Sequence, residues 1–183
     1  MDINLVLIVA SVLIVLYVWF TYNSLATGKV RIKEALSGID VQLKRRVDLV
    51  PNLLATVKGY AKHEKELLEN VTKARSSLMH ANTPHEKAAS DNMLSSALKS
   101  LIAISENYPD LKASKNFLHL QEELSDIEAK IAYARQFFNS NVNSYNSTLV
   151  NFPNSIIGNM FGFKTEEFFQ VSSEEKKNIK VQF

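Results

Sequence analysis

The chain has 183 residues and a formal net charge of +2, with 46% apolar and 22% charged residues. This is the balance of an ordinary globular protein, and the length suits one soluble domain behind an N-terminal hydrophobic segment. A charge this close to neutral does not favour nucleic acid as a partner. The chain has no cysteine, which excludes disulfides, thiolate metal sites and cysteine nucleophiles.

The first predicted element is a membrane-spanning helix from Ile3 to Phe20. Its sequence, INLVLIVASVLIVLYVWF, is apolar on every face rather than amphipathic. Eighteen residues rise roughly 27 Å, which is adequate for a bilayer core of about 30 Å. Tyr17, Trp19 and Tyr22 lie at one end, where aromatic rings favour the headgroup level.

A cleaved signal peptide is the alternative interpretation of this segment. Signal peptides carry positive residues ahead of a shorter apolar core and small residues at a cleavage site. Here Asp2 is the only charged side chain before the run, and no convincing cleavage site follows, although Ala26 and Gly28 are small. A retained anchor is favoured. Because Lys29, Arg31 and Lys33 follow the span and no basic residue precedes it, the C-terminal domain is predicted to lie in the cytoplasm.

Helical spacing continues beyond the span. Apolar residues recur at steps of three and four along one helical face, at Ile32, Leu36, Ile39, Leu43 and Val47. No strong breaker separates Phe20 from this face, so the span is predicted to continue into the domain as one long helix. A hinge at Gly28 would contradict this prediction. The basic triplet Lys44–Arg46 is interpreted as a solvated helix face.

Pro51 is predicted to interrupt the helix, with a kink or turn at residues 48–50, because proline disfavours helix at the residue before it and suits the first turn of a new helix. The second helix is expected to end near residues 80–82. Its predicted buried stripe comprises Leu54, Val57, Ala61, Leu68, Val71 and Leu78.

Thr83, Pro84 and Glu86 predict the start of a third helix. Threonine caps, proline takes the first helical position, and glutamate completes a capping box. This helix is expected to stop before Pro109, where residues 107–110 form a turn. Its predicted buried stripe comprises Ala89, Met93, Ala97, Leu101 and Ile104.

A long fourth helix follows, with near-heptad spacing that suits packing against long neighbours. Its predicted buried residues are Phe117, Leu120, Leu124, Ile127, Ile131, Ala134, Phe138, Val142 and Tyr145. The fold class is therefore all-α, with an N-terminal transmembrane helix followed by an up-and-down four-helix bundle of long antiparallel helices. An open intermolecular coiled coil is the alternative, and it needs fewer turn signals than this sequence has.

Aromatic residues crowd a tail that Pro153, Gly158 and Gly162 interrupt, and the tail is too short to span a bilayer. It could pack on the bundle, contact another subunit, or lie on the membrane face; the charged segment from Ser172 is expected to be frayed. The predicted organisation is an anchor over residues 1–22 with a short extracytoplasmic N-terminus, a helical bundle over 23–150, and an aromatic-rich tail over 151–183. The tail's apolar residues are Phe152, Ile156, Ile157, Met160, Phe161, Phe163, Phe168 and Phe169.

The sequence does not predict an enzyme. His63-Glu64 begins like a zinc-protease helix motif, but the second histidine one turn later is missing, and it would have to share the face to ligate the metal. The four histidines are scattered, and there is no phosphate-binding loop or nucleophile elbow. No catalytic, cofactor-binding or metal-binding residues are predicted, and no cofactor.

Several polar residues are expected to point inward. A catalytic interpretation of them would need a carboxylate with a raised pKa in a cleft. The favoured interpretation is structural: arginines pair with Asp48, Glu123 or Glu128 across helices and fix the register. Asn139 and Asn146, seven residues apart, are expected to face the same neighbour. The arginines concerned are Arg45, Arg46, Arg75 and Arg135.

These residues also carry a family resemblance. Residues 22–25 after the span, IDVQLKRRVDLVPNLLATVKGYAKHE over 39–64, ENYPDLKA over 106–113 and ARQFFNSNVNSYN over 134–146 follow in order. The Phe152-Pro153 and Phe161-Gly162-Phe163 pieces agree as well. Over nearly its whole length the chain resembles the LemA family. Leu36-Ser37-Gly38 stands where family members usually have a tryptophan, which weakens one packing position.

The resemblance implies a small bacterial membrane protein with one anchor and a four-helix bundle, and no established activity, cofactor or substrate. Relatives in magnetotactic bacteria are associated with building an organelle membrane, which implies a scaffold. We therefore expect a membrane-anchored, non-enzymatic scaffold or assembly protein in the bacterial inner membrane. Its expected partners are the lipid bilayer, further copies of itself and a protein at the membrane. The alternative is an adaptor that recruits or regulates a membrane enzyme such as a protease or a transport system.

Overall fold

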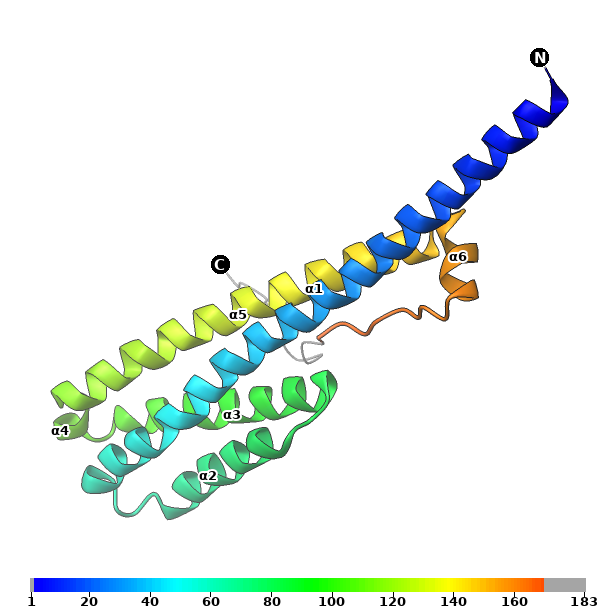
Figure 1. The fold of residues 1–183 in the computed structure, drawn as a ribbon. Helices are drawn as coiled ribbons and strands as arrows, with labels where there is room; N and C mark the ends of the chain where they lie inside the picture. The colour runs from blue at the N-terminus through cyan, green and yellow to red at the C-terminus, as the bar shows by residue number, and fades with distance from the viewer. Residues whose placement is uncertain (1, 170–183) are drawn as a thin grey trace, which may run out of the picture. The chain divides into compact units, whose positions relative to one another are not determined.

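The structure is a computed structural model that describes residues 2–169. Every regular element in that range is a helix (Figure 1). The segment from Ser172 that was expected to be frayed lies outside the described residues. The helices are α1 Ile3–Tyr60, α2 Lys65–His80, α3 Pro84–Ser105, α4 Pro109–Lys112, α5 Lys115–Val150 and α6 Asn154–Met160.

The first helix is continuous from the apolar N-terminal run to Tyr60 (Figure 1). It passes through Gly28 without a hinge, as predicted for a span that continues into the domain. One 18-residue window of α1 has a mean hydropathy of 2.7, and none of its residues is buried. The apolar N-terminal part of α1 is therefore a candidate membrane span.

The predicted break at Pro51 is wrong, because α1 continues through the proline for nine more residues. A proline inside a helix leaves the carbonyl four residues earlier without its usual N–H partner. Here that carbonyl belongs to Val47, and Arg75 Nε of α2 donates to it at 2.9 Å. A side chain from another helix thus takes the place of the missing backbone donor. The chain turns instead at residues 61–64, between α1 and α2.

Contacts divide the chain into two compact units, each described here by itself. The first comprises Met1–Ser37 and Gln136–Phe168; the second comprises Gly38–Arg135 and Phe169–Phe183. In the second unit, α2 packs against α3, and the last part of α1 and the first part of α5 contribute further core residues. Its most deeply buried apolar residues are Ile39, Val50, Leu53, Val57, Ala61, Val71, Ala74, Leu94, Leu98, Leu101, Leu111 and Phe117.

The start of α3 is as predicted. The Thr83 side chain accepts from the Glu86 backbone N–H at 3.1 Å, and the Glu86 carboxylate accepts from the Thr83 backbone N–H at 3.1 Å, which completes the capping box. The predicted buried face of α3 is wrong in part: Ala89 and Met93 are exposed, and Ala88, Leu94 and Leu98 are buried instead. The buried face of α3 is therefore rotated about the helix axis relative to the predicted face, and it includes Asp91. A pattern based on apolar residues does not recognise a buried carboxylate.

The link between α3 and α5 contains the short helix α4 where a plain turn was predicted, and α3 ends at Ser105. Leu111 of α4 is fully buried, so α4 closes one end of the second unit's core. The predicted stripe of α5 is confirmed at its main positions. Phe117, Leu124, Ile127, Ile131, Phe138, Val142 and Tyr145 are all buried.

The first unit joins the N-terminal part of α1 to the end of α5, to α6 and to the extended residues that follow. Tyr145 of α5 packs on Gly28 of α1 so closely that a Cβ at residue 28 would come within 2.9 Å of the Tyr145 ring. Gly158 of α6 similarly packs against Leu149 and Leu25. Two small residues therefore let α5 and α6 approach their neighbours closely.

Candidate functional site

A buried charge network occupies the core of the second unit. Asp91 of α3 accepts from Arg46 Nη1 of α1 at 2.8 Å and from Arg135 Nη2 of α5 at 2.5 Å. Arg46 and Asp91 are each only 1% exposed. The expectation of a solvated face at residues 44–46 is therefore wrong for Arg46, whereas the expectation that this arginine points inward and pairs across helices is confirmed.

The network is built to hold helices rather than to react. Each Asp91 oxygen is engaged by a guanidinium, so neither is left facing solvent as a general base. Arg46 Nη2 also lies 3.8 Å from Glu128, and the Arg135 guanidinium lies 5.1 Å from the ring centroid of Phe169, within cation–π range. Three helices thus meet at one carboxylate. The sequence predicted cross-helix pairing with Glu128, but it did not single out Asp91.

The other polar residues singled out from the sequence have separate roles. Arg75 bonds the Val47 carbonyl rather than a carboxylate, and Arg45 reaches only Gln42, at 3.5 Å. Asp48 pairs with Lys44 one turn away on the surface. In the first unit, the Asn146 side chain exchanges two hydrogen bonds with the Glu166 backbone, both 2.9 Å long. Asn146 therefore fixes the extended tail as a backbone partner would.

The residues of the incomplete zinc motif lie in the turn between α1 and α2. Glu64 accepts a 2.8 Å hydrogen bond from the Tyr108 hydroxyl, which raises the pKa of Tyr108 above its usual value. Among residues 2–169 there is no group of three or more histidine, aspartate or glutamate side chains placed to hold a metal ion. Glu64 thus ties the start of α2 to the link that carries α4.

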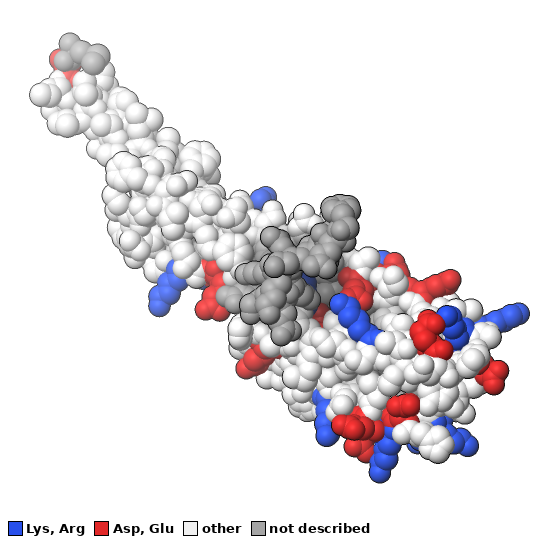
Figure 2. All heavy atoms as spheres, turned by 180° about the vertical axis from the view of Figure 1, so that it is seen from behind, with Lys and Arg blue, Asp and Glu red and all other residues white. Residues whose placement is uncertain are grey.

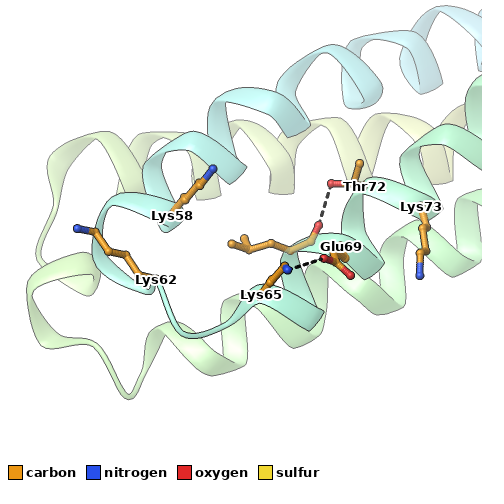
Figure 3. A pocket seen from close by; sticks show the side chains of 7 residues that line it. Lys58, Lys62, Lys65, Glu69, Thr72 and Lys73 are labelled. Atoms are coloured by element: carbon orange, nitrogen blue, oxygen red, sulfur yellow. Dashed lines mark hydrogen bonds and ion pairs between the residues drawn. The ribbon is translucent and has the colours of Figure 1, made fainter.

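A groove lies beside this turn (Figure 3). Its volume is about 700 Å³. Lys58 and Lys62 extend from one side, and Lys65 and Lys73 of α2 from the other (Figure 3). Leu68 contributes an apolar surface, and Glu69 and Thr72 complete the lining.

The groove carries an excess of positive charge. Its lining contains four lysines and a single carboxylate, Glu69, which lies 3.9 Å from Lys65. Within the described part of the chain, Lys58, Lys62 and Lys73 have no ion-pair partner. A groove of this kind suits an acidic segment with an apolar side. The sequence signal that could have found it is the spacing of Lys58, Lys62 and Lys65, but the second helix was predicted to run unbroken through residues 61–64, where the chain turns.

Comparison of the sequence with known proteins identifies relatives of this chain. The LemA family profile matches residues 35–183. The chain belongs to the LemA family. It is 28% identical over 161 residues to Protein LemA of Metamycoplasma hominis, covering 86% of this chain and 72% of the relative. It is 24% identical over 174 residues to the magnetosome protein MamQ of Magnetospirillum gryphiswaldense, covering 81% of this chain and 64% of that relative. MamQ 2 of Paramagnetospirillum magneticum is 23% identical with the same coverage.

In this LemA family member, the stretches that carry the resemblance hold polar contacts between helices. Residues 39–46 supply Arg46 of the buried network and Asp40, which lies 2.6 Å from Lys87 of α3. Residues 134–146 supply Arg135 to the network and, in the first unit, Tyr145, whose hydroxyl donates to the Lys164 carbonyl at 2.9 Å. These motif residues act as determinants of the fold.

Proposed function

We propose that this LemA family protein is a membrane-anchored, non-enzymatic scaffold that assembles with further copies of itself and with other proteins at a membrane. The observation that carries the proposal is the continuity of α1. One helix supplies both the apolar segment, in which no residue of the candidate span is buried, and some of the core residues of the second unit. The candidate anchor and part of the core of the second unit therefore belong to the same helix, α1.

Several finer features belong to the proposal. The soluble part forms an up-and-down four-helix bundle with antiparallel helices, and it uses no catalytic residue, cofactor or metal. The protein lies in the bacterial inner membrane with this part in the cytoplasm and does not bind nucleic acid. The basic residues that follow the span support the orientation, and the likeness to proteins named for the magnetosome supports a role at a membrane.

The oligomeric state of the full chain tests the scaffold. The chain is purified in detergent and in lipid nanodiscs, and its mass is measured by light scattering after size separation. A discrete oligomer that persists on dilution is the expected result. A strict monomer under both conditions would overturn the proposal.

The lysine groove favours a second candidate function, an adaptor that recruits a membrane enzyme. Opposite charges steer and orient a partner. Reversal of three groove charges (Lys58→Glu, Lys62→Glu, Lys73→Glu) is expected to abolish one stoichiometric crosslink to another membrane protein in cells. A matched control is Lys99→Glu, at an exposed position on α3. Recovery of self-crosslinks alone would exclude the adaptor.

A further inference from the structure

Helix α6 presents an apolar surface that the described residues leave uncovered. Phe152, just before α6, is 82% exposed, and Ile156 and Met160, one turn apart on α6, are 58% and 66% exposed. The opposite face is well packed, since Ile157 is 6% exposed and Gly158 lies against Leu149 and Leu25. The helix is thus fixed on one side and apolar on its open side.

The position of α6 along the anchor is set by hydrogen bonds. Asn154 Oδ1 accepts from the Tyr17 hydroxyl at 2.5 Å and from Thr21 Oγ1 at 3.4 Å. The Tyr22 ring contacts those of Phe161 and Phe163 edge to face, with centroids 5.0 and 5.6 Å apart. Residues 17–22 are the aromatic end of the apolar run, so α6 lies beside that end of the span (Figure 1).

Charge begins at matching positions on the two segments. Residues 3–28 of α1 and residues 151–163 of the tail contain no aspartate, glutamate, lysine or arginine. The first basic residue of α1, Lys29, lies 3.4 Å from Glu166 of the tail. On the face shown in Figure 2, the N-terminal part of α1 carries no charged group below its tip. The boundary between an apolar and a charged environment is therefore shared by α1 and the tail.

We infer that α6 is an interfacial membrane element, with Phe152, Ile156 and Met160 immersed in the lipid headgroup and upper acyl region. Lipid is the occupant because this surface lies beside the end of the apolar run of α1, whose Trp19 and Phe20 are 59% and 63% exposed. Interfacial helices bury their apolar face at this depth. The inference rests on the proposed membrane anchoring, and it adds a second contact that fixes how deeply the anchor sits.

The absence of cysteine in the sequence allows single labels to be placed without background. The full-length variants Ile156→Cys and Met160→Cys are spin-labelled in vesicles of phosphatidylethanolamine and phosphatidylglycerol. Accessibility is measured to oxygen, which concentrates in lipid, and to a water-soluble nickel chelate. Val12→Cys, within the apolar run, is the reference for immersion, and Thr165→Cys, an exposed position beyond the charge boundary, is the reference for water.

The expected result is that labels at 156 and 160 are more accessible to oxygen than to nickel, as at residue 12, with the reverse at residue 165. Nickel-accessible labels at 156 and 160 with an oxygen-accessible label at 12 would overturn the inference and leave the anchor in place. A nickel-accessible label at 12 would overturn the anchor as well. Protection from both reagents, with dipolar broadening that unlabelled protein relieves, would assign the surface to a second copy and also overturn the inference.

Discussion

Asp91 is a single carboxylate between the buried guanidinium of Arg46 and the partly buried guanidinium of Arg135, and its position has a large energetic consequence. Burying a charge is unfavourable unless partners replace its hydration, and removing one partner from a buried pair leaves the other uncompensated. Arg46 retains only the half-exposed Glu128 at 3.8 Å if Asp91 is removed. The two arginines would then meet in the core with little to separate their charges.

Asp91→Leu is therefore expected to destabilise the protein by about 3–5 kcal/mol, measured by thermal unfolding of the full chain in detergent. Arg46→Met should have a smaller effect, since Arg135 still pairs with Asp91. Replacing all three by apolar residues should recover part of the loss. Lys44→Ala, which removes an exposed pair with side chains 74% and 55% exposed, is the control and should change stability by at most about 0.5 kcal/mol. Equal effects of Asp91→Leu and Lys44→Ala would show that the buried network contributes no more to stability than an exposed ion pair.

Glu86 makes the stability of the α3 N-terminus depend on pH. Hydrogen bonds from the backbone N–H groups of Asn82 and Thr83 hold the pKa of Glu86 below its ordinary value of 4.5. A carboxyl whose pKa is lower in the folded state stabilises above its unfolded pKa, and this contribution is lost as pH falls through the folded pKa. The parent is thus expected to exceed Glu86→Gln in stability at neutral pH, with the difference shrinking in acid below about pH 4.5. Thermal unfolding of both proteins from pH 7 to pH 3 measures this difference in stability. Glu122→Gln, at an exposed position on α5, is the control, and a difference for Glu86→Gln that stays constant with pH would contradict the assignment.

At the scale of elements, the sequence predicted those helices whose determinants are local. The span, the Thr83 capping box and the α5 stripe each follow from neighbouring residues. The Pro51 break failed because Arg75, a residue 24 positions away on another helix, supplies the missing donor. The α3 face failed because its buried side is marked by Asp91, whose partners come from α1 and α5. Non-local polar partners, absent from any local pattern, account for both errors.

The pairing of Pro51 with Arg75 can be tested directly. Arg75→Met leaves the Val47 carbonyl without a donor, and an unsatisfied, largely buried acceptor costs about 1–3 kcal/mol. Pro51→Ala restores the backbone N–H. The loss caused by Arg75→Met is therefore expected to be much smaller in the Pro51→Ala background, as thermal unfolding of the four proteins of a double-mutant cycle would show. Equal losses in both backgrounds would mean that Arg75 acts elsewhere.

The candidate groove was not predicted from the sequence, because its lining depends on where the helices end. Its lysines lie on the end of α1, in the turn and on α2. The sequence predicted a single helix from Pro51 to residues 80–82, which contained all four lysines and lacked the turn at residues 61–64 that forms the groove. By contrast, the family resemblance could be found from ordered motifs alone, because it does not depend on where helices end.

At the scale of the whole molecule, the charges that flank the apolar run predict its orientation in the membrane. Lys29, Arg31 and Lys33 follow the apolar run, and no lysine or arginine precedes it. Basic residues near a span are retained on the cytoplasmic side. The short N-terminus should therefore cross the membrane, and the second unit should remain inside the cell.

Single cysteines in the cysteine-free chain test this orientation. A membrane-impermeant maleimide is expected to label Asp2→Cys in intact cells and to label Lys99→Cys only after the inner membrane is permeabilised. Both positions are exposed, so protection reports the membrane rather than the fold. The reverse pattern would place the helical body outside and show that the flanking charges do not govern insertion. Loss of the Asp2→Cys label together with a shortened mature chain would instead identify a cleaved signal peptide, because a retained anchor keeps residue 2 attached to the protein.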